Sequence, residues 1–248
     1  MRTLASLLLI LLLAGCGRML PDTPPGPYPP GPTPSGTPSG APPASIREVL
    51  IDRPIDGGTR AAVLGEGGSL GRCLAQLSAA DVRFSPRPDE ARGGACGLYD
   101  AGTLGADMGT VARMTPGDPT VTCQTALAIS IWRRQSVEPA AREIFGQDIV
   151  SIEHFGTYAC RPVNNVAGNR PSAHGLAAAL DFSGVRLRDG RRITVSGDWS
   201  GTDPEARFLR RIRDDACRIF GTVLSPDYNA FHDDHLHLEA TGGRAFCR

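Results

Sequence analysis

Apolar residues recur with helical spacing in the middle of the chain. Leu127, Ile131 and Trp132 fall on one helical face, which predicts a helix over about 120–136. A second helical piece is expected to follow it and to end near Phe145. This region is the strongest candidate for a buried helix.

Two further helices are predicted on either side of it. One covers about 71–80, and the other begins after Thr202-Asp203-Pro204, where a capping residue precedes a proline in the first turn. The apolar stripe of the later helix consists of Leu209, Ile212, Ala216 and Ile219.

Alternation of apolar and polar residues predicts strands. The expected strands cover about 46–51, 82–84, 149–158 and 234–240, together with two strands between 180 and 195. Arg188-Asp189-Gly190 lies between the last two, and Asp-Gly is a hairpin turn signal. Because helices and strands mix without a βαβ rhythm, the fold class is expected to be α+β, with a small antiparallel sheet flanked by helices.

The N-terminus has the pattern of an export signal. An apolar run from Leu7 to Leu13 follows Arg2, which predicts a signal peptide over 1–15. The run is shorter than the roughly 20 residues that a membrane-spanning helix needs. Leu13-Ala14-Gly15-Cys16 resembles the lipobox of bacterial lipoproteins, which implies acylation of Cys16 and a periplasmic protein anchored to the outer membrane.

Residues 16–44 are predicted to form a linker after the acylated cysteine. This stretch is rich in proline and glycine and has no apolar periodicity, so it cannot bury a core. Proline-rich chain extends about 3.1 Å per residue and acts as a stiff spacer; the alternative is a ligand for a proline-recognition module. The remaining residues, 45–248, suit one domain.

Charge and cysteine content narrow the classes of function. The formal net charge is +0 and every basic residue is arginine, so nothing favours nucleic acid as a partner. Apart from Cys16, the chain has an even set of cysteines, which in an exported protein predicts three disulfides. Close CxxC pairs, which a cysteine zinc site would use, are absent from the sequence. Pairing by proximity along the chain gives Cys73–Cys96, Cys123–Cys160 and Cys217–Cys247.

All five histidines lie after residue 150, and three of them are close together. His235 and His237 lie two apart in a predicted strand, so their side chains point to the same face. Two imidazoles on the same face can bind one metal ion. His232, Asp233 and Asp234 lie next to them in the sequence and have side chains that can also bind metals. The alternative is a pair of histidines on an exposed strand face.

A second cluster lies in the segment SAHGLAAALD. His174 belongs to a loop of small residues, and the apolar run that follows carries Asp181 into the core. A buried carboxylate needs a partner, because an unpaired charge is costly in a low dielectric. A metal ion is one such partner, and a salt bridge to an arginine is the other.

The two clusters together resemble the LAS metallopeptidases, which share the motif SxHxxGxAxD followed by HxH. Ser172, His174, Ala179 and Asp181 fit the motif, whereas Ala177 stands at the glycine position. The HxxHxH spacing resembles the murein endopeptidase and carboxypeptidase branch.

The chain is more closely similar to the bacterial extensin-like C-terminal domain family. The resemblance rests on Tyr158-Ala159-Cys160-Arg161, the SxHxxxxAxD motif, the Asp-Gly hairpin, a helix that bears a cysteine, and the HxDHxH pattern over 232–237. It implies a LAS metallopeptidase or hedgehog-like fold over 45–248.

The resemblance also implies a function. His174, Asp181 and His237 would hold one zinc ion, His235 would be the general base, and His232 would stabilise the oxyanion. Two imidazoles and one carboxylate leave zinc an open position for water, as in catalytic sites. The expected activity is hydrolysis of peptidoglycan, at peptide cross-links or stem-peptide bonds, as an endopeptidase or a carboxypeptidase.

Three other residues have expected roles. Arg161 would grip a carboxylate or carbonyl of the substrate. Ser172 would hydrogen-bond a metal ligand or cap its turn, and His154 is expected to be structural.

Other chemistries fit the sequence less well. HExxH and GxSxG motifs are absent from the sequence. The same ligand set suits ferrous oxygenases, but an oxidising compartment and the lack of a cosubstrate motif favour zinc. The main alternative is a non-catalytic, metal-containing lipoprotein that binds the cell wall.

Overall fold

A computed structural model describes residues 49–248. The predicted signal peptide, the lipidated Cys16 and the linker lie outside the described residues. Among residues 49–248, no helix has the length and apolar character required to cross a membrane.

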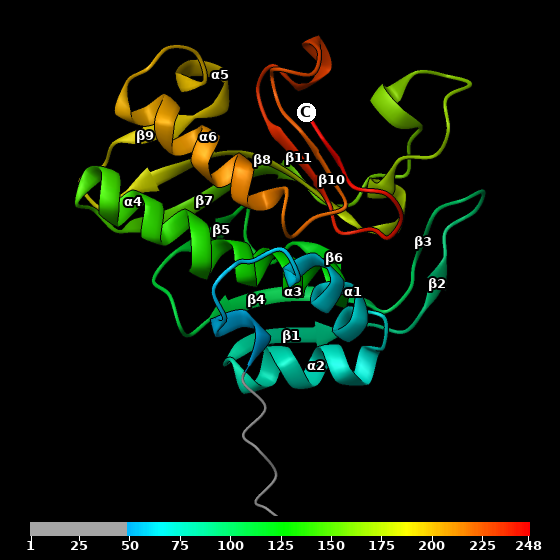
Figure 1. Ribbon diagram of the computed structural model, residues 1–248. Coiled ribbons are helices and arrows are strands. Elements are labelled where there is room, and N and C mark those ends of the chain that lie inside the picture. The colour runs from blue at the N-terminus through cyan, green and yellow to red at the C-terminus, as the bar shows by residue number, and fades with distance from the viewer. Residues whose placement is uncertain (1–48) are drawn as a thin grey trace, which may run out of the picture. The chain divides into compact units, whose positions relative to one another are not determined.

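The largest sheet has the strand order β12-β10-β11-β8-β7-β5, and β9 pairs with β8 as well (Figure 1). Its strands are β5 (Arg113–Thr115), β7 (Ile149–Gly156), β8 (Ala179–Leu187), β9 (Arg192–Thr194), β10 (Thr222–Leu224), β11 (Leu236–Glu239) and β12 (Phe246–Cys247). β5 runs parallel to β7 and β12 parallel to β10, while the other neighbours are antiparallel. The expected antiparallel sheet is therefore larger than predicted and mixed at both edges.

Two smaller sheets precede it in the sequence. One has the order β1-β4-β6 and is antiparallel, and the other is the hairpin of β2 and β3. Their strands are β1 (Val82–Pro86), β2 (Glu90–Ala91), β3 (Gly97–Leu98), β4 (Ala101–Asp107) and β6 (Thr120–Thr122).

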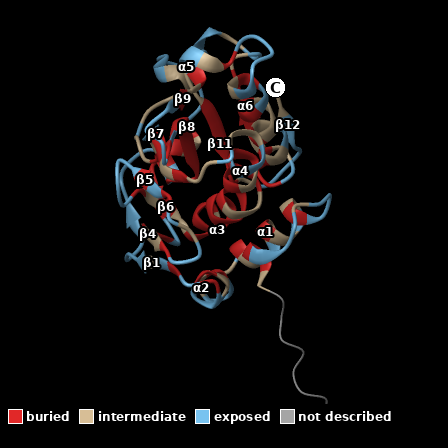
Figure 2. Ribbon diagram, turned by 90° about the vertical axis from the view of Figure 1, so that its left-hand side faces the viewer, coloured by how far each residue is buried: buried red, intermediate tan, exposed pale blue. Residues whose placement is uncertain are grey.

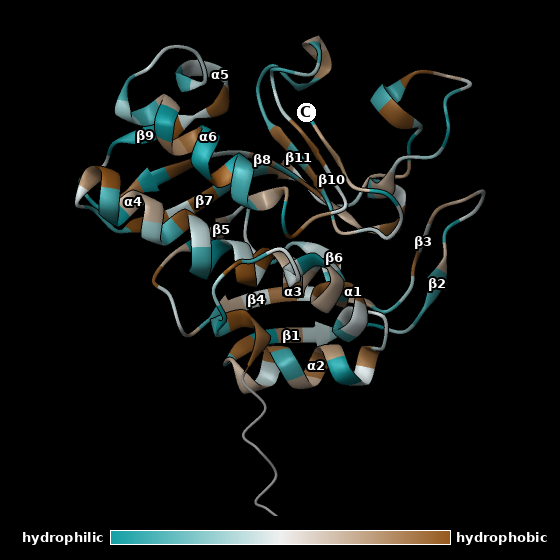
Figure 3. Ribbon diagram, viewed as in Figure 1, coloured by the Kyte–Doolittle hydropathy of each residue, from teal (hydrophilic) through white to brown (hydrophobic). Residues whose placement is uncertain are grey.

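One buried α-helix lies at the centre, with the first two α-helices and the last packed against it. The α-helices are α1 (Thr59–Gly67), α2 (Leu70–Ala79), α3 (Cys123–Trp132), α4 (Glu138–Phe145), α5 (Val195–Asp198) and α6 (Pro204–Ala216). α3 lies between the small sheet with α1 and α2 on one side and α6 on the other, and it is buried along most of its length (Figure 2). By contrast, hydrophilic and hydrophobic bands alternate along α2 and α6, as expected for helices with one exposed face (Figure 3).

Several predicted elements are confirmed. α2 and α4 lie where helices were expected, and the hairpin of β8 and β9 turns at the predicted Asp-Gly. Asp203 caps α6, since its carboxylate accepts a hydrogen bond from the backbone N–H of Ala206 at 2.8 Å. The predicted apolar stripe of this helix is buried.

Two predicted boundaries are wrong, for identifiable reasons. Of the strand expected over 46–51, residues 46–48 lie outside the described residues, and the described part is contradicted by a short 3-10 helix, η1, at Leu50–Asp52. The amide of Leu50 donates to the side chain of Gln76 rather than to a neighbouring strand. The helix expected from residue 120 begins at Cys123, because the three residues before it form β6 and pair with β4.

The helical chain continues after α3 as a π-helical segment, η2 (Arg133–Val137). Arg133 is 1% exposed, and its guanidinium lies 2.5 Å from the carboxylate of Asp107, which is fully buried. Arg134 contacts the same carboxylate and also Asp52, at 2.9 Å. This cluster ties η2 to the end of β4.

Three disulfides form, as predicted, but two of the proposed pairings are wrong. Cys217–Cys247 is confirmed, whereas the other bridges are Cys73–Cys123 and Cys96–Cys160, with Cα–Cα distances of 5.8, 6.1 and 5.7 Å. Proximity along the chain failed because the bridges join elements that meet only in the fold: α2 with the start of α3, and the β2–β3 hairpin with the loop after β7. The bridges indicate folding in an oxidising compartment outside the cytoplasm.

Candidate metal centre

Three of the predicted site residues meet on one face of the large sheet. His174 lies in the 3-10 helix η4 (Ala173–Leu176), Asp181 on β8 and His237 on β11. β8 and β11 are antiparallel neighbours, and their register places His237 directly opposite Asp181. The leucines on either side of His237 point to the opposite face and are fully buried in the core.

The ligand atoms of these residues converge. Asp181 Oδ1 lies 3.0 Å from His174 Nε2 and 2.8 Å from His237 Nδ1, and the two nitrogens are 3.2 Å apart. All three side chains are buried, and together they form a group able to hold a metal ion.

The outer nitrogens of both histidines have hydrogen-bond acceptors of their own. His174 Nδ1 donates to the carbonyl of Thr157 at 3.1 Å, and His237 Nε2 donates to Glu239 Oε1 at 2.9 Å. When the imidazoles are neutral, as a metal ion requires, these bonds keep the N–H on the outer nitrogens and leave the lone pairs of His174 Nε2 and His237 Nδ1 on the side of Asp181.

The donor set fits a divalent cation with a preference for nitrogen and oxygen ligands. A tetrahedral zinc with bonds of about 2.0–2.2 Å needs ligand atoms roughly 3.3 Å apart. The observed separations of 2.8–3.2 Å are slightly shorter, so the ligands need to move apart only by tenths of an ångström. Two imidazoles oriented from outside and one carboxylate form a ligand set that could hold such an ion.

Glu239 is a functional candidate that sequence reasoning missed. It is 7% exposed, and its carboxylate contacts His237. It lies two residues after His237 on the same strand, so the period of two that picked out the HxH pair also marks this residue.

The electrostatics of the cluster follow from these contacts. Burial alone would raise the pKa of Asp181, but hydrogen bonds from His174 and His237 hold it far below its ordinary value. Burial would lower the pKa of His237, yet Asp181 and Glu239 raise it to about 9. A metal ion requires the neutral imidazole, so a cation at this site displaces a proton.

His235 and His232 lie beside the cluster, as the sequence predicted. His235 Nδ1 is 2.7 Å from Asp234 Oδ1, and its Nε2 lies 3.5 Å from Asp181 Oδ1. The ring centroid of His232 is 5.2 Å from that of His235. His232 is buried, and its Nδ1 is 2.7 Å from Asn229 Oδ1.

The loop after β7 forms one wall beside the cluster. Arg161 Nη2 lies 3.7 Å from Asp181 Oδ2, so the arginine partner considered for Asp181 is present in addition to the histidines. The hydroxyl of Ser172 accepts from the amide of His174 at 3.3 Å and thus caps η4. Ala177, at the glycine position of the motif, has φ +54°, a left-handed conformation that glycine adopts more readily.

The Cys96–Cys160 disulfide packs against this wall. A Cβ added to Gly175 would lie 3.0 Å from Cys96 Sγ, so glycine at this position lets the bridge approach the turn that carries His174.

The cluster opens into a cavity of about 400 Å³. The three candidate ligands, His232, His235, Arg161 and Ser172 all line it, as does Glu239. His154 lies outside the lining, and its Nε2 donates to the carbonyl of Pro116 at 2.9 Å. The structure thus gathers every predicted catalytic or ligand residue at one cavity and leaves His154 apart.

Fold and site together define a mixed α/β protein with a buried centre of two histidines and one carboxylate at the edge of a cavity. Residues 71–248 match the family described as extensin-like protein C-terminus. The chain belongs to this family, as its motifs indicated, and the matched region includes every residue of the site. No curated protein and no solved structure matches the chain.

Proposed function

We propose that the protein is a zinc-dependent peptidoglycan hydrolase, related to the LAS metallopeptidases, that cleaves peptide bonds of the cell wall. The observation that carries the proposal is the convergence of His174 Nε2, His237 Nδ1 and Asp181 Oδ1, with the tautomers of both histidines fixed from outside. The sequence motif supports the relation to peptidases, and the cavity beside the cluster offers room for a substrate.

A zinc ion held by these ligands would polarise the scissile carbonyl and acidify a water molecule. His235 is the group placed to accept the proton of that water. Its Nδ1 donates to Asp234, so the lone pair on Nε2 is free, and this nitrogen lies on the side of Asp181. Asp234 orients the ring.

Arg161 is better suited than His232 to stabilise an oxyanion. Asn229 Oδ1 accepts from the amide of Phe231 at 3.0 Å, so the same oxygen must also be the acceptor for His232 Nδ1–H. A neutral His232 therefore has a bare Nε2, which cannot donate. Burial and the neighbouring His235 and His237 lower the pKa of His232 to about 4, whereas the guanidinium of Arg161 donates at any physiological pH.

The disulfides are consistent with a periplasmic location. Acylation of Cys16 and attachment to the outer membrane complete the proposal. A lipid anchor followed by a stiff spacer would keep the enzyme close to the polymer and favours cross-links as the substrate.

The test is digestion of purified sacculi by the zinc-loaded protein. We expect soluble muropeptides whose masses identify the bond cleaved, and we expect EDTA to stop their release and added zinc to restore it. Cross-linked dimers that become monomers indicate an endopeptidase, and loss of a terminal alanine indicates a carboxypeptidase. Binding to sacculi without any product contradicts the hydrolase and supports the non-catalytic wall-binding lipoprotein.

Replacing Glu239 by glutamine is expected to weaken zinc binding by about 10–100-fold. The substitution keeps an oxygen that accepts from His237 Nε2–H but removes the negative charge behind the ligand. Competition with a chromophoric chelator measures the affinity. Asp234→Asn is the matched control, because it removes a charge beside His235, which is not a proposed ligand; equal losses in both variants would contradict the role of Glu239.

A further inference from the structure

Three aromatic side chains line the cavity. They are Tyr228, Phe231 and Phe246, and we call them the aromatic wall. They are 43%, 58% and 39% exposed, and exposed apolar surface that lines a cavity is typical of an interaction site. The Tyr228 ring lies 5.6 Å from Phe246 and 5.7 Å from His232, so two of the three rings lie side by side and reach the histidines of the site.

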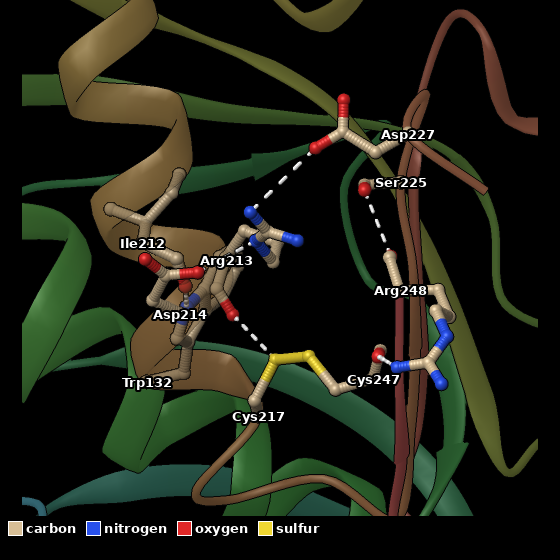
Figure 4. The surroundings of a disulfide bond; sticks show 9 residues. All are labelled: Trp132, Ile212, Arg213, Asp214, Cys217, Ser225, Asp227, Cys247 and Arg248. Atoms are coloured by element: carbon tan, nitrogen blue, oxygen red, sulfur yellow. Dashed lines mark hydrogen bonds and ion pairs between the residues drawn. A yellow bond between two sulfur atoms is a disulfide. The ribbon is translucent and has the colours of Figure 1, made fainter.

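The backbone that carries the aromatic wall is fixed. The Cys217–Cys247 disulfide joins the residue after α6 to β12, next to Phe246 (Figure 4). Ser225 Oγ donates to the carbonyl of Arg248 at 2.8 Å, which ties the start of the β10–β11 loop to the same strand.

Asp227 anchors the loop a second time. Its carboxylate accepts from the indole of Trp199 at 2.9 Å. The same carboxylate lies 3.7 Å from Arg213, near the end of α6 (Figure 4). Tyr228 follows directly. The rings are thus exposed on a braced backbone, which lowers the entropy cost of binding a ligand against them.

Other residues of the lining have a different chemistry. Arg161, Arg170, Asn164 and Asn165 provide cationic and amide donors. A ligand that fills the cavity therefore needs both hydrogen-bond acceptors and a flat apolar face.

We propose that the aromatic wall is a saccharide subsite, on which a pyranose ring of the glycan strand stacks while the peptide stem faces the arginines. The inference rests on the peptidoglycan substrate of the proposed function. Stem peptides of peptidoglycan have small or charged side chains, which leave an aromatic surface uncovered. The C–H face of an N-acetylated sugar is the flat apolar surface that such a substrate contains, and aromatic rings bind surfaces of this kind.

The experiment is an NMR titration of the zinc-loaded protein with a peptide-free N-acetylglucosaminyl–N-acetylmuramic acid disaccharide, which has no bond for a peptidase to cleave. Phe231→Ala is the test variant, because this ring is the most exposed of the three and its loss leaves the core intact. We expect the variant to bind the disaccharide about five-fold or more weakly. Met108→Ala, which removes a 62% exposed apolar side chain outside the cavity, should bind like the wild type.

A sugar-free stem peptide, titrated in parallel, identifies the occupant. Its affinity should be the same for the wild type and Phe231→Ala. The saccharide subsite is overturned if the wild type does not bind the disaccharide. It is also overturned if Phe231→Ala loses affinity equally for the peptide and for the disaccharide. If the protein binds the disaccharide but releases no products from sacculi, the hydrolase is contradicted and the saccharide subsite is supported. If it releases products but does not bind the disaccharide, the hydrolase is supported and the saccharide subsite is contradicted.

Discussion

Replacement of His237 by alanine is expected to reduce zinc affinity by more than about 100-fold, because loss of a ligand exceeds the 10–100-fold cost of losing a supporting contact. His237 provides one of three converging donor atoms, 2.8 Å from Asp181 Oδ1 and 3.2 Å from His174 Nε2. The two ligands that remain cannot enclose the ion. Metal analysis after dialysis should find one zinc per chain in the wild type and almost none in the variant, and digestion of sacculi should stop.

The matched control is His154→Gln. His154 is also a buried histidine of the large sheet, but it lies outside the cavity lining and hydrogen-bonds to Pro116. This variant should keep the zinc affinity of the wild type. If His237→Ala retains one zinc per chain, or if both variants lose it equally, the three-residue centre is wrong.

Replacement of Asp107 by alanine is expected to lower the free energy of unfolding by about 3–5 kcal/mol, the cost of leaving a buried charge without its partner. Arg133 is 1% exposed, and its guanidinium lies 2.5 Å from Asp107. Arg134 loses the same partner. Because arginine stays protonated in proteins, neither cation can escape the penalty by losing a proton.

Urea unfolding with the disulfides intact measures this difference. Asp52→Ala is the control, since Asp52 pairs with Arg134 at 2.9 Å but its side chain is 52% exposed. A pair of this kind contributes less than about 1 kcal/mol. Equal destabilisation by the two variants would show that burial of the Asp107 carboxylate has no special cost.

Local sequence signals predicted the elements that depend on local chemistry. Asp203 and the proline after it mark the start of α6, and Asp-Gly marks the turn between β8 and β9. The strand period of two placed His237 facing the same side as His235, and the register of β8 and β11 then brought Asp181 opposite.

What the sequence did not predict depends on contacts between distant segments. β6, β10 and β12 have three residues or fewer, too few for alternation to be visible. Cys73 and Cys123 meet because α2 packs on α3, which the spacing of cysteines cannot reveal. The aromatic wall likewise combines Tyr228 and Phe231 from a loop with Phe246 from an edge strand.

Because of the Cys96–Cys160 disulfide, the structure around the site depends on the redox state of the compartment in which the chain folds. It fastens the loop that carries Arg161 to the β2–β3 hairpin and packs beside the turn of His174. Cytoplasmic thiols stay reduced, so this fastening forms only after export. In a chain that is still in the cytoplasm, the candidate ligands are present, but the loop that carries Arg161 is not covalently linked to the β2–β3 hairpin. For the hydrolase proposed above, redox maturation would delay activity until the chain reaches an oxidising compartment.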